Sequence, residues 1–533
     1  MGETMLLRFC LQALARFGPC AFAAVILGAA GAALAADQTI SASVFQDRLE
    51  GGWAGEMVGV TWGAPTEFHA QGDMLPDADV PAWTSATING GFNQDDIYVE
   101  VPFMQAMKDH GVNCSWTDFG NHFKDTAFNL WHANYSGRWN LNHGVAAPGS
   151  GHYSNNAHCD DIDWQIESDF AGLVSPGQTS AAINLAWRAG HVMNYGDGVY
   201  GGVAVAAMHS AAYFATNVRQ IVDAGRLAVP SGSKYRQALD DVVSWHDLGN
   251  SWTQTWQLLQ NKWGTTDRCP SGVGNPFNID AKLNGAYVVI GLLYGGGNFQ
   301  ESMRIAMRCG QDSDCNPSTV GGILGNWLGL SGIPDTFKSD LDRTGTKFSN
   351  TDLTFDDAVA LSRDLARNVL LMNGGSVSGS GANEVWTIPT KTALAPILEQ
   401  WPATSNAAPA LTASASVKAG LTIQFDASAT DTPDGIADYQ WYFGDLTSAD
   451  GASGTHTYGQ PGTYEALCYV TDGIGNTSWQ SFTLNVTPEP ATLALVGLGL
   501  IGLLARARKR GQDPFSKNSI KALKSGLRCE KGS

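Results

Sequence analysis

The chain has little charge and is particularly poor in positive charge. Charged residues make up 15% of its 533 residues, and 32 Lys and Arg stand against 50 Asp and Glu, which gives a formal net charge of −18. A surface of this sign repels phosphate, so no nucleic-acid partner is expected. Hydrophobic residues make up 44% of the chain. This content excludes a disordered chain and is enough for two or three domains.

The few basic residues gather at the chain ends. Residues 506–533 hold nine Lys and Arg, and residues 37–505 retain 21 basic against 47 acidic groups, a net charge of −26. Such an excess of carboxylates serves either solubility or the binding of hard cations.

Several catalytic and metal-binding motifs are missing. The sequence contains no CxxC pair and no GxSxG motif, so neither a zinc knuckle nor a serine hydrolase is expected. His152, His158 and Cys159 lie close together, but loop histidines are more often solvated than metal-bound. Outside the two ends, disulfides are possible for an exported protein, although spacing assigns no pairs among Cys114, Cys159, Cys269, Cys309, Cys315 and Cys468.

Residues 1–36 have the pattern of a secretory signal peptide. Arg8 and Arg16 precede an apolar, Ala-rich run over residues 21–34, which closes on small residues before Asp37. This order of basic, apolar and small residues is typical of a cleaved export signal. The sequence therefore predicts an exported protein.

Residues 488–510 have the pattern of a second targeting segment. Residues 491–505 carry no charge, a run shorter than the about 20 residues of a spanning helix, and residues 506–510 are mostly basic. With Pro488-Glu489-Pro490 in front, the segment resembles the PEP-CTERM sorting signal of Gram-negative bacteria. The resemblance implies a transient inner-membrane anchor, a sorting protease as partner, and delivery to the cell surface or medium. A basic tail, residues 511–533, extends beyond it.

Residues 37–400 have the pattern of an all-α domain. Apolar residues recur at helical spacing, as at Ala204, Ala207, Met208 and Ala211, and strand-like alternation is scarce. A Gly/Ser stretch over residues 373–383 marks a boundary, and residues 401–410, rich in Pro and Ala, form the expected linker.

The period changes to two after the linker, which predicts a small β-sandwich over residues 411–487. The sequences Trp441-Tyr442-Phe443-Gly444-Asp445 and Val470-Thr471-Asp472-Gly473 resemble motifs of the polycystic-kidney-disease (PKD) domain. The resemblance implies an Ig-like fold that acts as a spacer or binds carbohydrate or protein.

Two acidic clusters in the helical region are candidates for metal binding. Residues 93–100 and 309–316 each place two carboxylates within three residues, at the expected start of an apolar helix. Hard divalent cations require several oxygen ligands in a compact cage. The alternative is that these carboxylates only stabilise helix N-termini. The second cluster is not an EF-hand loop, because Pro317 and Ile323 replace the required Gly and Glu.

Together the clusters resemble the motifs of the ADP-ribosylglycohydrolase family over residues 45–371. The opening motif is matched by residues 55–59 and 63–68, and the two metal motifs by residues 94–97 and 311–315. The resemblance implies an all-α fold and two Mg²⁺ ions, with Mn²⁺ as an alternative. The implied metal ligands are Asp95, Asp96, Asp312 and Asp314, with Gln94 and Cys315 at the positions of the family's hydroxyl ligands.

The same resemblance suggests the catalytic and substrate-binding residues. Glu67, in the Gly-Ala-Pro-x-Glu motif, is the candidate general acid/base. A third acidic run, residues 160–169, precedes the position of the family's substrate loop and makes Asp161 and Asp163 candidates for contact with a sugar hydroxyl. Asp197, at the start of the expected central helix, is a further candidate. A solvated helix face is the alternative for the third run.

The predicted function is that of a secreted, metal-dependent glycosylhydrolase, which cleaves an ADP-ribosyl or related N- or O-glycosidic bond. The rival is a non-catalytic surface protein that binds carbohydrate or protein. The four Asp residues and Glu67 distinguish the two, because a binding protein has no need of them.

Overall fold

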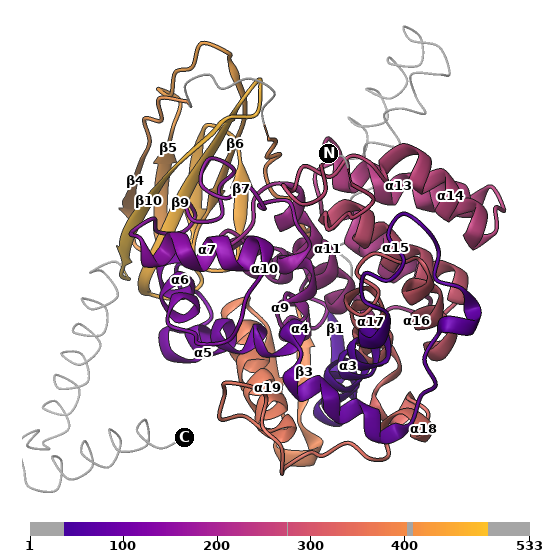
Figure 1. Cartoon of the computed structure of the whole chain (residues 1–533). Helices are drawn as coiled ribbons and strands as arrows, with labels where there is room; N and C mark the ends of the chain where they lie inside the picture. The colour runs from indigo at the N-terminus through magenta and orange to yellow at the C-terminus, as the bar shows by residue number, and fades with distance from the viewer. Residues whose placement is uncertain (1–36, 274, 402–408, 489–533) are drawn as a thin grey trace, which may run out of the picture.

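The computed structural model describes residues 37–273, 275–401 and 409–488. The predicted signal peptide, most of the linker, and the C-terminal anchor and tail from residue 489 onward lie outside the described residues. The described chain forms a large helical domain followed by a β-sandwich (Figure 1). The predicted fold class is therefore confirmed.

The helical domain consists of mostly short helices joined by loops. The α-helices are α3 (Ala42–Gly63), α4 (Asp95–Tyr98), α5 (Glu100–His110), α6 (Trp116–Lys124), α7 (His132–Asn142), α8 (Asp163–Ile166), α9 (Asp169–Leu173), α10 (Thr179–Gly190), α11 (Asp197–Ala212), α12 (Val218–Leu227), α13 (Lys234–Asp247), α14 (Trp252–Trp263), α15 (Ala281–Gly295), α16 (Phe299–Arg308), α17 (Cys315–Leu328), α18 (Asp335–Lys338) and α19 (Phe355–Met372). Short 3-10 helices interrupt the loops at η1 (Ala64–Thr66), η2 (Asp77–Asp79), η3 (Ser85–Asn93), η4 (Leu330–Gly332) and η5 (Gly381–Asn383).

Helices α3 and α17 lie in direct backbone contact at the centre of the domain (Figure 1). The face of α3 that meets α17 and its flanking loops carries a glycine at every fourth position, Gly51, Gly55, Gly59 and Gly63. A Cβ on Gly55 would lie 2.0 Å from the carbonyl oxygen of Gly321, on α17. Any larger residue would force the helices apart, so the glycine spacing sets their separation.

Two further helices are buried on nearly all sides. In α11 and α15 almost every residue is buried, as expected for helices that are apolar all round. The side chains of α11 pack against α8, α9, α10, α12 and α17. These helices form the core around which the shorter, amphipathic helices are arranged.

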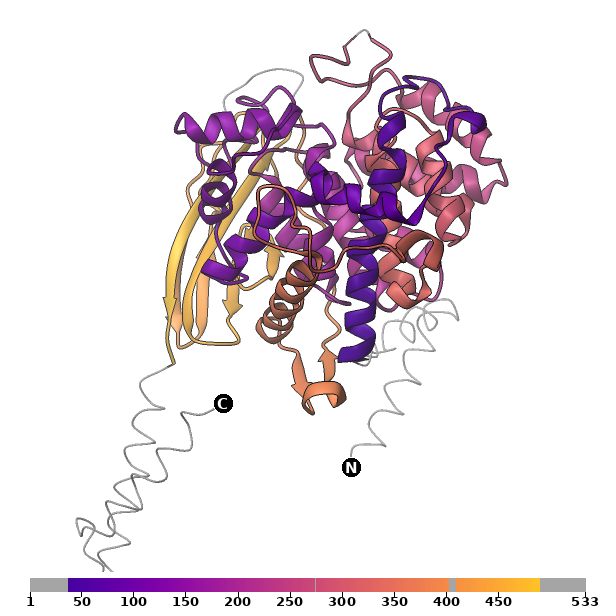
Figure 2. The same cartoon turned by 60° about the horizontal axis from the view of Figure 1, so that its bottom comes forward.

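A small antiparallel sheet belongs to the helical domain and was not predicted. Its strands are β1 (Gln38–Ser41), β2 (Ser376–Ser378) and β3 (Val385–Ile388), in the order β1-β3-β2. Figure 2 shows the β2–β3 hairpin at the bottom of the domain, below α19. The Gly/Ser stretch over residues 373–383 therefore folds back onto the start of the domain, and pairing with β1 stabilises strands too short to show a period.

The C-terminal part is a sandwich of two antiparallel sheets. One has the order β10-β9-β6-β7 and the other β4-β5-β8. Phe425, Trp441 and Tyr464 belong to the buried core between them. The strands are β4 (Ser414–Ala419), β5 (Thr422–Asp426), β6 (Ile436–Tyr442), β7 (Ser448–Asp450), β8 (Ser453–Thr457), β9 (Gly462–Asp472) and β10 (Thr477–Val486).

The sandwich packs firmly against the helical domain. Tyr442 of β6 stacks on Trp187 of α10 with ring centroids 4.0 Å apart, and Tyr469 of β9 belongs to the same buried cluster. On the connecting segment, Glu399 pairs with the buried His191 at 2.8 Å. The outer face of the four-stranded sheet is thus part of a shared core, and the sandwich is not a loose spacer.

The structure bears on two further features of the sequence, the cysteines and the membrane anchor. All six cysteines of the described chain, Cys114, Cys159, Cys269, Cys309, Cys315 and Cys468, are buried and free. Within the described ranges, no helix has the length and apolar character needed to cross a membrane. The predicted C-terminal anchor is not part of those ranges.

The glycine face of α3 leads to the first testable prediction. The substitution Gly55→Ala is expected to lower the free energy of unfolding by about 1–3 kcal/mol or more, because the new methyl group meets a backbone oxygen that cannot rotate away. An Ala in an unobstructed helix would instead stabilise it by about 1 kcal/mol. Denaturant unfolding of the two proteins measures the difference.

Gly459→Ala is the matched control. Gly459 is exposed, and a Cβ there meets no atom within 4 Å, so this variant should unfold like the wild type. A Gly55→Ala protein as stable as the control would contradict close backbone contact between α3 and α17.

Candidate metal centre and active site

Several segments that are far apart in sequence line one cavity of about 360 Å³. They include the loop after α3, the start of α4, the starts of α7 and α8, and the loop that leads into α17. The predicted site residues that line this cavity are Glu67, Gln94, Asp95, Asp163, Asp312, Asp314 and Cys315. The structure thus brings together carboxylates that the sequence separates by more than two hundred residues.

Hydrogen bonds between two of these loops hold Glu67 beside the second acidic motif. The backbone N–H of Phe68 donates to the carbonyl of Gln311 at 3.0 Å, and the N–H of Gln311 donates to the carbonyl of Ala70 at 2.8 Å. The hydroxyls of Thr66 and Ser313 lie 2.8 Å apart. Gln311 itself has a positive φ of 55°, a turn that is uncommon for residues other than glycine.

The residues at the N-cap positions of α4 and α17 do not cap these helices with their side chains. Asp314 occupies the N-cap position of α17, but its side chain makes no capping hydrogen bond. Gln94, at the N-cap position of α4, makes none either. Their polar groups therefore remain available to a ligand in the cavity, although the helix dipoles still favour negative charge at these positions.

The oxygen donors of the second motif have the chemistry of a cation site. Ligand atoms of Asp312, Asp314 and Cys315 all lie within 4.8 Å of one another. The Oδ1 atoms of Asp312 and Asp314 are buried and have no hydrogen-bond partner, a costly state for a carboxylate. A divalent cation would satisfy both oxygens, so the residues present fit such an ion.

Burial and mutual repulsion make these carboxylates hard to ionise without a cation. Although Glu67 is exposed, its partial desolvation, followed by the charges of Asp314 and Asp95, raises the pKa of its carboxyl to about 7. Burial and the charge of Asp314 raise the pKa of Asp95 to about 6. Burial also raises the pKa of Asp312 and Asp314. Among the described residues that line the cavity there is no Lys or Arg to offset this charge.

Asp96 lies beneath the cavity and does not line it. Its side chain is fully buried, and the thiol of Cys315 donates to its Oδ2 at 3.3 Å. Burial, with the charges of Asp312 and Asp314, raises the pKa of that thiol. The Cys315 thiol thus contacts Asp96 and also lines the cavity beside Asp312 and Asp314.

A layer of buried carboxylates below the cavity was not anticipated. Glu56, Glu100 and Glu167 are essentially inaccessible, and neither carboxylate oxygen of Glu56 has a hydrogen-bond partner. Burial raises the pKa of all three groups. Two of them follow a predicted site residue by four positions, Asp96 and Asp163, so the one-turn spacing of acidic residues was the signal for them.

The three predicted substrate residues occupy different places. Asp163 lines the cavity, and its carboxylate accepts the backbone N–H groups of Ala133 at 3.3 Å and Asn134 at 3.1 Å. Asp161 is completely buried beside His158. Asp197 lines a separate cavity of about 500 Å³, between the helical domain and the segment that leads to the sandwich.

Aromatic side chains form part of the cavity wall and its mouth. Phe68, Tyr98 and Trp131 line the cavity, and Trp131 is 54% exposed. Tyr135 and Trp139 are also more than half exposed and follow at intervals of four residues, so they extend one face of α7 for about 12 Å. The four-residue spacing of Trp131, Tyr135 and Trp139 was the sequence signal for this surface.

Two family models match the C-terminal part of the chain. The PKD domain matches residues 406–487, and the PEP-CTERM protein-sorting motif matches residues 486–509. A solved PKD1 domain of the Vibrio cholerae metalloprotease PrtV is 27% identical and covers 15% of this chain and 99% of its own, with a TM-score of 0.15.

Collagenase ColA of Bacillus cereus is 37% identical over 71 residues, which are 13% of this chain and only 7% of that protein. A solved structure described as an ADP-ribosylglycohydrolase-related protein complex is 16% identical and covers 61% of this chain and 99% of its own, with a TM-score of 0.41.

The helical domain gives the longest match. Residues 41–370, more than half of the chain, match the ADP-ribosylglycohydrolase family, and this range contains every residue of the cavity described above. The protein belongs to the ADP-ribosylglycohydrolase family.

Proposed function

We propose that the protein is an exported, metal-dependent glycoside hydrolase that cleaves an ADP-ribosyl or related N- or O-glycosidic bond. The observation that carries the proposal is the convergence of Glu67, Asp95, Asp312 and Asp314 on one cavity. A binding surface alone gives no reason to bury mutually repelling carboxylates such as those of Asp312 and Asp314.

Asp95, Asp312 and Asp314 are the residues that would hold the divalent cations, with Mg²⁺ or Mn²⁺ as the ions best matched to carboxylate oxygens. When bound, such ions supply Lewis-acid polarisation and a template for substrate hydroxyls. Asp96 lies beneath these ligands and accepts a hydrogen bond from the thiol of Cys315, which lines the cavity. Gln94 lines the cavity and offers a carbonyl oxygen at its rim.

Glu67 is the proposed general acid/base. Its pKa of about 7 gives comparable amounts of the protonated and ionised forms at neutral pH, which suits proton transfer in both directions. The acid form donates a proton to the leaving group of the glycosidic bond. The carboxylate form takes a proton from the attacking water.

The cavity wall favours a substrate that is neutral at the bound end. Its described lining includes no Lys or Arg that could pair with a pyrophosphate, whereas Asp163 and Asn134 can accept or donate hydrogen bonds to hydroxyl groups. Trp131 at the mouth offers a flat surface for a sugar or base ring. A ribosyl or other glycosyl group attached to a neutral aglycone fits this lining better than ADP-ribose does.

The targeting segments complete the proposal. The PEP-CTERM segment is proposed to hold the protein transiently in the inner membrane until a sorting protease releases it to the surface or medium.

The sandwich, fixed to the helical domain through Trp187 and Tyr442, is proposed to bind carbohydrate or protein and so to bring the cavity to its substrate. A purely binding function is favoured only by the exposed aromatic face of α7.

The metal hypothesis predicts stabilisation by Mg²⁺ or Mn²⁺. At an ion concentration 100 times the Kd, the free energy of unfolding at pH 8 should rise by about 2.7 kcal/mol. The gain should shrink at pH 5, because Asp95 has a pKa of about 6 and its proton then competes with the metal. Thermal unfolding of EDTA-treated protein with and without each ion measures the effect.

Asp312→Asn should abolish this stabilisation, whereas Asp335→Asn should leave it intact because the Asp335 side chain is 90% exposed in an ion pair with Lys338. Equal stabilisation of the Asp312→Asn protein and the wild type would show that the ions bind elsewhere.

The catalytic hypothesis predicts that Glu67→Gln lowers kcat by about 10²- to 10⁴-fold, the usual contribution of a general acid/base, while Mg²⁺ still stabilises the protein. Release of a free sugar or ADP-ribose from a panel of ADP-ribosyl, nucleoside and oligosaccharide substrates is the assay. Glu301→Gln, a change at an exposed carboxylate on α16, is the control. Loss of both turnover and metal binding in Glu67→Gln would assign Glu67 a structural role instead.

The aromatic mouth predicts a selective effect on substrate binding. Trp131→Ala should raise KM by about 2- to 10-fold through loss of ring stacking, with a smaller change in kcat. Trp139→Ala should have this effect only on substrates long enough to reach the far end of α7. An unchanged KM in Trp131→Ala for every substrate that is cleaved would exclude stacking at the mouth.

A further inference from the structure

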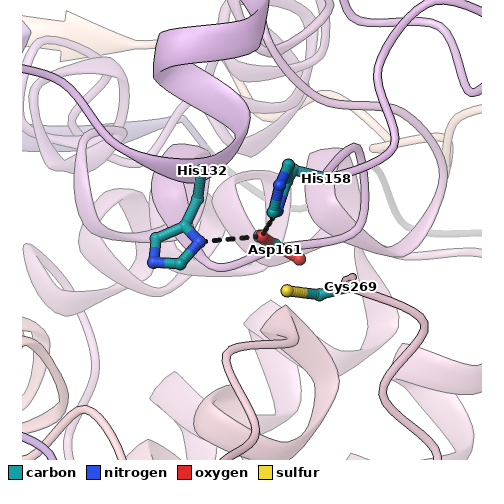
Figure 3. A group of neighbouring side chains, drawn as sticks. All are labelled: His132, His158, Asp161 and Cys269. Carbon is teal, nitrogen blue, oxygen red and sulfur yellow. Dashed lines mark hydrogen bonds and ion pairs between the residues drawn. The ribbon is translucent and has the colours of Figure 1, made fainter. Parts of the chain in front are cut away.

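A second group of metal-ligating side chains lies behind the wall of the cavity. His132 is the first residue of α7, His158 and Asp161 precede α8, and Cys269 lies in the loop between α14 and α15. Figure 3 shows both imidazole rings directed at the carboxylate of Asp161, with the sulfur of Cys269 beside it. Three separate segments of the chain thus supply the four side chains of this group.

The spacing of these atoms is close to that of a tetrahedral metal site. One ligand atom from each of the four residues lies within 4.8 Å of all the others. The Nδ1 atoms of His158 and His132 lie 2.7 Å and 3.5 Å from Oδ2 of Asp161. In a tetrahedral zinc site with bonds of about 2.0–2.3 Å, ligand atoms are about 3.3–3.7 Å apart. Shifts of roughly 1 Å would therefore complete the site, with the 2.7 Å pair of His158 and Asp161 moving apart and the wider pairs closing.

The donor set differs in kind from that of the first centre. Two imidazoles, one thiol and one carboxylate are the ligands of zinc, whereas magnesium selects oxygen donors alone. Asp161 and Cys269 are fully buried, and the two histidine side chains are 24% and 20% exposed. The site is therefore enclosed on the protein side, as structural zinc sites are.

We infer that His132, His158, Asp161 and Cys269 form a structural zinc site. The ion joins three segments that the fold otherwise connects through long loops, so it removes much of their conformational freedom. It also positions one wall of the active-site cavity, because His132 itself lines that cavity together with its neighbour Trp131. The role assigned to Asp161 is thus that of a metal ligand and not of a substrate contact.

The neighbouring candidates His152 and Cys159 are not part of this site. The ring of His152 contacts the hydroxyls of Ser154 and Thr477, on the side that faces the sandwich. The four ligands come from three segments that are far apart in the sequence. No CxxC or HxxxH spacing in the sequence indicates the site.

The test measures zinc and cobalt binding to the purified full chain. After dialysis against Zn²⁺ and removal of loose metal, elemental analysis should find one tightly bound zinc per chain in the wild type. The zinc affinity should fall in Cys269→Ser and in His158→Ala by more than the roughly 10- to 100-fold loss typical of an outer-shell change. Cobalt in place of zinc should give the intense near-ultraviolet absorption of a cobalt–thiolate bond.

Cys315→Ser is the decisive control, because Cys315 is the thiol of the first centre. The cobalt–thiolate absorption should disappear in Cys269→Ser and persist in Cys315→Ser and in Asp312→Asn. The opposite pattern, or wild-type protein that retains no zinc above the level of the double variant His158→Ala/Cys269→Ser, would overturn the assignment. His143→Ala, at an exposed histidine that caps the far end of α7 from His132, should bind zinc like the wild type. Because the readout is metal and not turnover, failure of the proposed activity would leave this result unchanged.

Discussion

The close approach of α3 and α17 is the constraint on which the rest of the structure depends. The glycines of α3 allow its backbone to touch that of α17, with Gly55 against Gly321. At the C-terminal end of this contact, Gly63 meets the backbone of Ser313 and Asp314. The loop that carries Glu67 begins one residue later. Wider separation of these helices would therefore part Glu67, the proposed general acid/base, from the carboxylates of the second motif.

Several acidic side chains of the chain lie together at the C-terminal end of α3, where it meets the loop before α17. The carboxylates at the cavity repel one another, and desolvation disfavours their charged forms, as the raised pKa values of Glu67 and Asp95 show. A fold that keeps such groups together is less stable in the absence of cations, and cation binding restores that stability.

Much of the site could be predicted from the sequence, because each motif is local. Asp95 and Asp314 mark helix starts, and Glu67 follows a helix end, so their types and positions are legible in short stretches of chain. Such reasoning could not predict the small sheet of β1, β2 and β3. It also could not predict that the Asp96 side chain points away from the cavity. Strands of three or four residues carry no period, and the direction of a side chain depends on what packs against it.

The sequence by itself determined the helical and β-sandwich halves and the residues that could bind hard cations, since periodicity and clustered carboxylates are properties of neighbouring residues. Only the tertiary structure decided which carboxylates face the cavity. It turned Asp163 toward the cavity, placed Asp197 in another one, and brought Cys269 to His132 and Asp161. The physical reason is that burial and ligand geometry arise from contacts between segments far apart in the chain, which no local pattern records.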